Sequence, residues 1–175
     1  MNNIEIVPVN KENLKDYVFV NVNSWNETYR GIMSDDFLDM IMNNIDLNVQ
    51  RQIDSFDEKL KEEPDYKRFI LYELGEAIGM FSINKSSNEK YPNSGEIRAI
   101  YLLKKAQKKG YGKYMFERAI EEIKKINYES MIICCLEKNP TNEFYKHMGG
   151  KLVDSINRNI ANQDLVENVY YYEKI

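Results

Sequence analysis

A largely apolar segment leads into a glycine-containing turn and then into a patterned helix, and this order constrains the fold more than any other feature. The apolar segment spans residues 97–103, and the turn reads Gln107-Lys108-Lys109-Gly110-Tyr111-Gly112. From about residue 113, apolar side chains recur at helical spacing. Two glycines one residue apart let the backbone turn sharply and bring its N–H groups close to a ligand. A helix that begins there adds unpaired N–H groups and partial positive charge, which together favour a phosphate-bearing ligand.

The same turn is rich in lysine, although the chain as a whole is acidic. The net charge is −4, yet lysines occupy positions 104, 105, 108, 109 and 113. The turn nevertheless does not match either of two common nucleotide-binding motifs. A Walker A loop requires other residues where Gln107 and Tyr114 stand, and the dinucleotide motif requires glycine where Met115 stands. A lysine-rich surface turn capped by glycines is the alternative interpretation.

The rest of the chain predicts a mixed α/β (α+β) fold in one domain over residues 1–175. A chain of this length can bury a sizeable core. Apolar patterns predict strands near residues 4–9, 69–74, 77–83, 97–103, 131–136, 151–157 and 166–173. Helical periodicity predicts helices near residues 14–29, from 35 onward, 47–61, from 113 onward and 142–148.

Four segments carry a common family pattern. Gln107, Gly110 and Gly112 fit a Gln/Arg-x-x-Gly-x-Gly/Ala motif between a strand and a helix. Residues 139–149 fit Asn-x-x-Ala-x-x-Phe-Tyr-x-x-x-Gly with some drift, and the remaining segments are residues 96–102 and 24–32. In this order they resemble the GNAT superfamily of acyl-CoA-dependent N-acetyltransferases. The resemblance covers essentially the whole chain and implies a twisted, mostly antiparallel central sheet flanked by helices.

The resemblance implies acetyl-CoA as the cofactor, with its pyrophosphate at the turn. It also implies a bulge near residues 101–103 that frees an N–H group for the thioester carbonyl. Asn139 matches a family asparagine that touches the pantetheine arm, with a strand-end turn residue as the alternative. The candidate cofactor-binding residues are Tyr101, Leu102, Leu103, Gln107, Lys108, Lys109, Gly110, Tyr111, Gly112, Lys113 and Asn139.

Two side chains are candidates for acid–base catalysis. A primary amine is almost entirely protonated at neutral pH, so its attack on a thioester needs a base. Glu96 matches a glutamate of many family members and is expected to act through water, with a solvent-facing carboxylate as the alternative. Tyr145 matches the family tyrosine near the cofactor sulfur, with a core tyrosine as the alternative. Because a phenol has a higher pKa than a thiol, we expect Tyr145 to donate a hydrogen bond to the developing thiolate. Gly150 stands where the family usually has phenylalanine, which leaves open how the chain packs beside Tyr145.

Other aromatic, cysteine and histidine residues are weaker candidates. Trp25 and Tyr29 lie on the helix that walls the acceptor pocket in the family, but their spacing also suits core packing. Cys134 and Cys135 are neighbours in a predicted strand and so point to opposite faces, which predicts core thiols without a disulfide. His147 is the only histidine and fits a helix C-terminus, so no metal ligand set is apparent.

Charge and composition limit the partners and the cellular location that we expect for this chain. Net acidity disfavours nucleic acid as a partner, and no apolar run is long enough to predict a membrane helix. The first residues lack the pattern of a signal peptide, so we expect a cytoplasmic protein. The leading hypothesis is an N-acetyltransferase in which a primary amine of a small molecule or peptide attacks acetyl-CoA directly in a ternary complex. A non-catalytic acyl-CoA-binding or sensing domain of the same fold is the alternative, and a homodimer is compatible with either.

Overall fold

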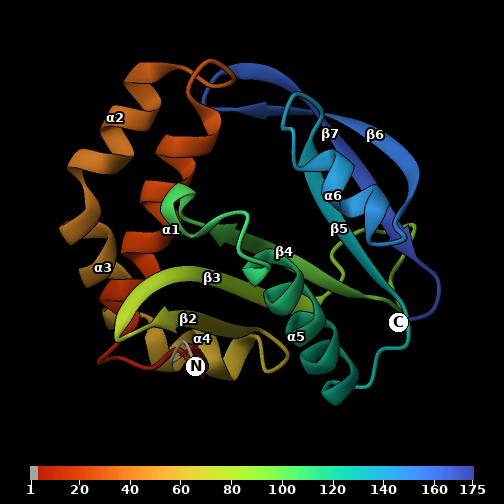
Figure 1. The fold of residues 1–175 in the computed structure, drawn as a ribbon, viewed down its shortest axis with the longest axis horizontal. Helices are drawn as coiled ribbons and strands as arrows, with labels where there is room; N and C mark the ends of the chain where they lie inside the picture. Colours follow the sequence, from red (N-terminus) through yellow and green to blue (C-terminus); the bar gives the residue numbers. More distant parts are fainter. Residues whose placement is uncertain (1–3) are drawn as a thin grey trace.

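The computed structural model describes residues 4–175, which form a seven-stranded sheet (Figure 1). The strand order is β1-β2-β3-β4-β5-β7-β6. Neighbouring strands are antiparallel except β4 and β5, which are parallel. This architecture confirms the predicted mostly antiparallel sheet. The strands are β1 (Ile4–Pro8), β2 (Lys67–Glu73), β3 (Glu76–Lys85), β4 (Gly95–Leu102), β5 (Met131–Leu136), β6 (Lys151–Ile160) and β7 (Gln163–Tyr172).

Helices cover both faces of the sheet. The helices are α1 (Leu14–Tyr29), α2 (Asp35–Asn43), α3 (Ile45–Asp54), α4 (Phe56–Glu62), α5 (Tyr111–Lys125) and α6 (Asn142–His147), with a short 3-10 turn at Lys104–Ala106. Side chains of α1, α3 and α4 share one buried cluster, whereas those of α5 and α6 share another on the opposite face. None of the helices within residues 4–175 is long and apolar enough to cross a membrane.

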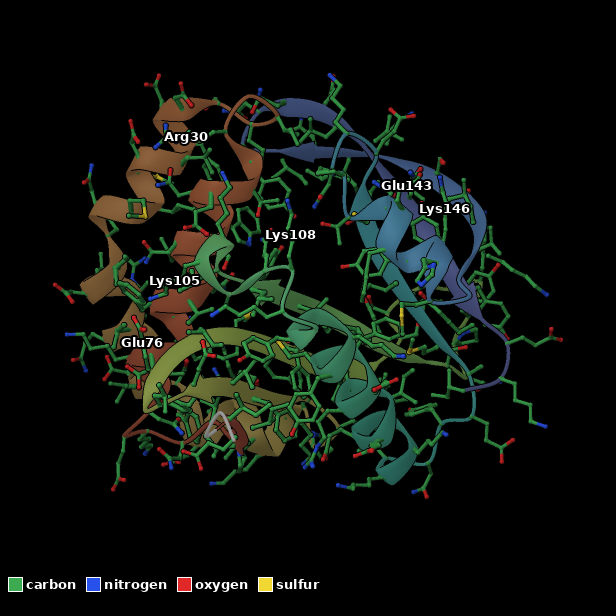
Figure 2. All side chains as sticks on the ribbon, viewed as in Figure 1. Arg30, Glu76, Lys105, Lys108, Glu143 and Lys146 are labelled. Atoms are coloured by element: carbon green, nitrogen blue, oxygen red, sulfur yellow. The ribbon has the colours of Figure 1, made fainter. Side chains whose placement is uncertain are left out.

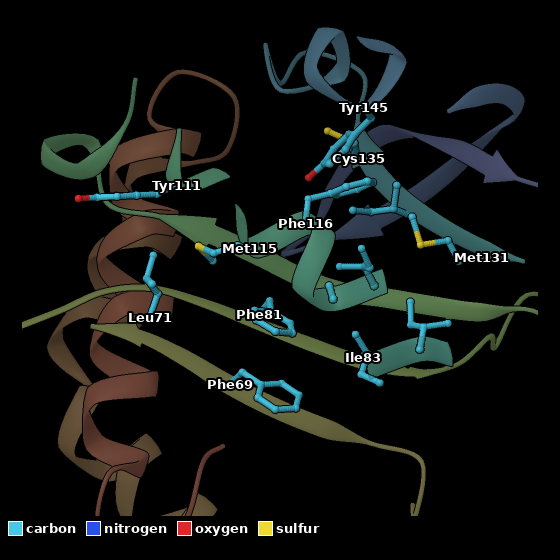
Figure 3. Close-up of a cluster of buried hydrophobic side chains, with 14 of the residues drawn as sticks. Phe69, Leu71, Phe81, Ile83, Tyr111, Met115, Phe116, Met131, Cys135 and Tyr145 are labelled. Atoms are coloured by element: carbon cyan, nitrogen blue, oxygen red, sulfur yellow. The ribbon is translucent and has the colours of Figure 1, made fainter. Parts of the chain in front are cut away.

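Alternation along the strands separates these two clusters. In β2, Phe69 and Leu71 belong to the cluster under α5, while Ile70 belongs to the cluster under α1. Figure 3 shows the α5 side, where Met115 and Phe116 project from the helix toward the sheet. The buried face of α5 therefore fixes the position of the turn that precedes it.

Two helical regions differ from their predicted bounds, at places where the sequence signals were weak. The segment 47–61, predicted as one helix, belongs to the two helices α3 and α4, which are separated at Ser55. α5 begins at Tyr111 rather than near Lys113. The earlier start places the helix N-terminus inside the glycine-containing turn.

Two hairpins also differ from their predicted boundaries. The β2–β3 hairpin turns at Leu74 and Gly75, whose φ angles are 53° and 81°, one residue before the gap between the strands predicted at 69–74 and 77–83. β6 and β7 extend to a tight turn at Ala161 and Asn162, with φ angles of 51° and 60°, and are longer than predicted. Positive φ at both central residues is the pattern of a type I′ hairpin turn.

The sheet opens between β4 and β5. Their parallel pairing is confined to residues 95–97 of β4 and 131–133 of β5. Beyond Ile97, β4 continues beside β3, while β5 pairs with β7, so the two parallel strands diverge (Figure 1). The later part of β4 is left without a neighbouring strand on this side.

Candidate functional site

The opening between β4 and β5 continues into a groove of about 1280 Å³. Its walls come from β4 and the turn before α5, from β5 and α6, and from α1 with the β6–β7 hairpin. The predicted site residues that line it are Trp25, Tyr29, Glu96, Tyr101, Leu102, Gln107, Lys108, Gly110, Gly112, Lys113, Asn139 and Tyr145. The fold therefore brings candidates from distant parts of the sequence into one cavity.

The turn before α5 has the geometry of an anion site. Gly110 has a φ of 85°, a left-handed conformation that glycine adopts at little cost. The amide of Tyr114 donates to the Gly110 carbonyl at 3.2 Å, so the amides of residues 111–113 precede the first helical hydrogen bond. A Cβ on Gly112 would meet no atom within 4 Å, which leaves the approach open. These amides and the helix dipole favour a phosphate group.

The lysine cluster divides between the groove and the outer surface. Lys108 and Lys113 line the groove. Lys105 and Lys109 instead pair with carboxylates of the β2–β3 hairpin, and Figure 2 shows Lys105 beside Glu76. Of the predicted cofactor-binding residues, Leu103, Lys109 and Tyr111 do not line the groove.

β4 carries a bulge, but at Arg98 rather than near residues 101–103. Successive residues of β3 pair with Ala99 and Ile97, which leaves Arg98 as the extra residue. The apolar run around it gave no signal for the bulge. The bulge coincides with the point where β4 and β5 part.

Free N–H groups of β4 nevertheless face the opening. The amide of Leu103 donates to the Ile78 carbonyl at 3.0 Å. Because hydrogen-bonded and non-hydrogen-bonded pairs alternate along an antiparallel ladder, the amide of Tyr101 also faces β3. The amides of Ile100 and Leu102 therefore point toward the groove, where no strand pairs with them.

Aromatic side chains from α1, β4 and α6 line the middle of the groove. The hydroxyl oxygens of Tyr29 and Tyr101 are 3.2 Å apart, and the ring of Trp25 meets that of Tyr29 edge-on at 5.2 Å between centroids. Burial raises the pKa of Tyr29, Tyr101 and Tyr145 above the ordinary value of a phenol. All three hydroxyls therefore stay protonated at neutral pH and can donate hydrogen bonds.

Tyr145 is buried, yet it has a hydroxyl available to a ligand. It is 5% exposed and lines the groove. Among residues 4–175, none forms a hydrogen bond with this hydroxyl. Because the hydroxyl lies on the groove lining, it can donate a hydrogen bond to a bound molecule.

Asn142 anchors the helix that carries Tyr145. The Asn142 side-chain amide donates to the carbonyls of Leu136, Glu137 and Asn139 at 2.8, 3.1 and 2.6 Å. Its oxygen accepts from Tyr170 at 2.8 Å and Asn168 at 3.1 Å. These bonds fix the first turn of α6 to β5 and β7. Counted from Asn139, Asn142 stands where the family pattern has alanine, but counted back from Phe144 that position is Thr141, so the pattern did not identify Asn142.

Gly150 makes room for Tyr172. The Tyr172 hydroxyl donates to the Tyr145 carbonyl at 2.9 Å and so holds the end of α6. A Cβ on Gly150 would lie 2.8 Å from the Tyr172 ring and 2.9 Å from the Tyr145 carbonyl oxygen. A tyrosine from β7 thus packs against the position where the family usually has phenylalanine.

Replacing Gly150 by alanine should destabilise the protein by about 1–3 kcal/mol, because the new methyl group overlaps a buried ring and a backbone oxygen. Urea unfolding measures the change. Gly112→Ala is the matched control, since its Cβ meets no atom within 4 Å and alanine suits a helix. Equal midpoints for the two variants would contradict the close packing at Gly150.

Glu96 lies where β4 still pairs with β5. Its Oε2 accepts from the backbone amide and the hydroxyl of Ser87 at 3.2 and 3.3 Å, and its Oε1 is 4.0 Å from Nε of Arg98. Glu96 is only 7% exposed and lines the groove, unlike a surface carboxylate. Its surroundings orient the carboxylate and partly balance its charge.

Cys134 and Cys135 are free thiols, as predicted. Burial, followed by the nearby Glu167 carboxylate, raises the pKa of both thiols to about 12. At pH 8, iodoacetamide should therefore label them about 100-fold more slowly than an ordinary exposed cysteine. Mass spectrometry measures the labelling, and the rate should rise as pH increases. Protein unfolded in urea is the control, and equally fast labelling of the native protein would contradict the raised pKa values.

One end of the groove is lined by residues that the sequence did not predict as site residues. β6 contributes Asp154 and Arg158, β7 contributes Glu167, and the segment after α1 contributes Met33. Their local patterns resemble ordinary strand and loop surfaces, and only the folded hairpin brings them to the groove. Within residues 4–175, no group of three or more His, Cys, Asp or Glu could hold a metal ion.

Comparison with known proteins identifies the family. The model of the acetyltransferase (GNAT) family matches residues 26–149. The chain belongs to this family. A curated relative, the uncharacterized N-acetyltransferase YuaI of Bacillus subtilis (strain 168), is 30% identical over 157 residues, which cover 89% of this chain and 85% of YuaI.

Solved structures share the fold of this GNAT acetyltransferase. The PaiA N-acetyltransferase from Thermoplasma acidophilum, crystallised with coenzyme A, has a TM-score of 0.70 at 18% identity, with 97% of this chain and 99% of PaiA covered. The yncA acetyltransferase from Salmonella typhimurium, described as putative and solved with its cofactor acetyl-CoA, has a TM-score of 0.69 at 14% identity, with 97% and 93% covered. At these identities the likeness shows the fold.

Proposed function

We propose that this GNAT acetyltransferase transfers the acetyl group of acetyl-CoA to a primary amine of a small molecule or peptide, by direct attack in a ternary complex. The observation that carries the proposal is the groove between β4 and β5, which joins an anion-type turn, unpaired strand amides and Tyr145 in one cavity. The solved relatives that hold coenzyme A or acetyl-CoA support the same cofactor here.

In this proposal the pyrophosphate of acetyl-CoA binds at the N-terminus of α5. The amides of residues 111–113 are the hydrogen-bond donors, and Lys108 and Lys113 supply positive charge. The pantetheine arm then follows the unpaired edge of β4. Asn139 faces it from the opposite wall. Its side-chain oxygen accepts the Thr141 amide at 2.9 Å, and its NH₂ group can donate to the cofactor.

The amine approaches the thioester past Trp25 and Tyr29. Deprotonating an ordinary primary amine at pH 7 costs about 4.6 kcal/mol, so a base lowers a substantial part of the barrier. Glu96 accepts this proton through water, held in place by Ser87 and Arg98. The new bond joins the amine nitrogen to the acetyl carbon.

Two kinds of donor stabilise the charge that develops as the amine attacks. The amides of Ile100 and Leu102 are placed to donate to the thioester oxygen, a contribution of about 3 kcal/mol for a well-aimed donor. As the carbon–sulfur bond breaks, Tyr145 donates a hydrogen bond to the departing thiolate. The new amide nitrogen loses its remaining extra proton, the thiolate takes up one proton, and the thiol leaves as coenzyme A.

A panel of amines tests the activity directly. Protein, acetyl-CoA and each amine are combined, and released coenzyme A is measured with a thiol reagent. We expect release that depends on both protein and amine. The alternative, a non-catalytic acyl-CoA-binding domain, predicts saturable acetyl-CoA binding without thiol release for any amine. Glu96 favours the enzyme, as does the Tyr145 hydroxyl, which has no hydrogen-bond partner within residues 4–175.

A further inference from the structure

A second cavity, of about 410 Å³, lies between the α1–α3–α4 layer and the sheet. We call it the basic pocket. Four cationic side chains line it: Arg51, Lys59, Arg68 and Arg98. Of the described residues that line it, none is Asp or Glu. This is the opposite of the chain as a whole, whose net charge is −4. Four cations around one cavity create a positive potential that attracts anions.

Arg68 is the central observation. It comes from β2 and is only 8% exposed. One guanidinium nitrogen donates to the Gln52 side-chain oxygen at 3.0 Å. Among residues 4–175, no carboxylate lies within 4.0 Å of this guanidinium, as an ion pair would require. A buried charge without an ionic partner is costly, and an anion in the pocket would remove much of that cost.

Aromatic rings hold the guanidinium in place. The carbon of the Arg68 guanidinium lies 4.9 Å from the ring centroid of Phe56, 5.7 Å from that of Tyr17 and 5.6 Å from that of Tyr66. Cation–π contacts stabilise the side chain but do not neutralise its charge. They also fix its direction, which lowers the entropy cost of binding an oxyanion.

The remaining cations are also free of carboxylate partners or only weakly engaged. Among the residues that the structure describes, Arg51 and Lys59 form no ion pair. Arg98 is 4.0 Å from Glu96, at the limit for an ion pair. Arg98 also lines the large groove, so the basic pocket adjoins the groove at the bulge of β4.

We propose that the basic pocket binds a small, multiply charged oxyanion with phosphate or carboxylate groups. Guanidinium groups match both kinds of oxyanion with paired, charge-assisted hydrogen bonds. The volume exceeds what one phosphate fills, which suits a phosphate ester or a polycarboxylate. The ligand is separate from the amine and from the coenzyme A of the proposed reaction.

Anion titration tests this site without reference to activity. Inorganic phosphate and citrate are titrated separately into the full chain at constant ionic strength, with binding measured by calorimetry. We expect saturable binding of at least one anion, and its identity distinguishes a phosphate ligand from a polycarboxylate. Lys59→Gln should weaken this binding at least about 10-fold, as loss of one charge-assisted contact predicts.

Two further variants locate the bound anion. Lys61→Gln is the matched control, since Lys61 is exposed on the same helix and does not line the pocket. It should bind as the unchanged protein does. Lys108→Gln removes a cation of the large groove and should also leave this affinity unchanged. The proposal is overturned if neither anion binds saturably, if Lys59→Gln and Lys61→Gln bind alike, or if only Lys108→Gln weakens binding.

Discussion

Replacing Tyr145 by phenylalanine should lower the turnover of acetyl transfer by about 100-fold, the range typical for loss of a positioned proton or hydrogen-bond donor. The hydroxyl lines the groove and has no hydrogen-bond partner within residues 4–175. Phenylalanine keeps the ring and removes only the donor, so no protein group loses a partner. The affinity for acetyl-CoA should therefore change little. Thiol release gives turnover, and calorimetry gives the cofactor affinity.

This difference between turnover and binding separates catalysis from packing. If Tyr145 were only a core residue, the phenylalanine variant would keep normal turnover, or would lose activity only in step with its stability. Tyr128→Phe is the matched control because Tyr128 lies beyond α5 and outside the groove lining. It should retain both properties. Normal turnover in Tyr145→Phe would remove the proposed role.

Sequence patterns sufficed for the parts of the fold with strong local signals. The strand at residues 131–136 and the helix from residue 35 onward were both predicted, and the Ser34 hydroxyl accepts the Phe37 amide at 3.1 Å at the start of α2. The turn at Ala161 could not be predicted, because alanine rarely adopts a positive φ and gives no turn signal. The bulge at Arg98 was also hidden, since which residue is left unpaired depends on the partner strand.

Some residues of the candidate site were likewise recognisable from the sequence, and others were not. Gln107 and Gly110 were recognisable from their spacing, and Tyr145 from its family segment. The far wall of the groove was not recognisable from the sequence, because Asp154 and Arg158 reach it only through the fold of the β6–β7 hairpin. Likewise, the cations of the basic pocket lie on four separate elements, and no local pattern links them. Sites that depend on long-range pairing leave little trace in one sequence.

Replacing Gly110 by aspartate should weaken coenzyme A binding by at least about 100-fold, or about 2.7 kcal/mol. Gly110 has a φ of 85°, and a Cβ there would meet no protein atom within 4 Å. The main effect is therefore a carboxylate placed where the proposed pyrophosphate binds. Two like charges about 4 Å apart near a protein surface repel by about 4 kcal/mol, enough to account for such a loss. Calorimetric titration with coenzyme A measures the change.

Two variants separate charge from backbone strain in this experiment. Gly110→Asn has nearly the same size and shape as the aspartate variant but no charge, and asparagine tolerates a left-handed backbone. It should retain most of the affinity. Gly75→Asp places the same carboxylate at a φ of 81°, also with no atom within 4 Å, in the β2–β3 turn outside the groove. It should bind coenzyme A normally despite similar strain. Unchanged affinity in Gly110→Asp would instead mean that the phosphates bind away from the start of α5, and the turn would then be only a lysine-rich surface loop.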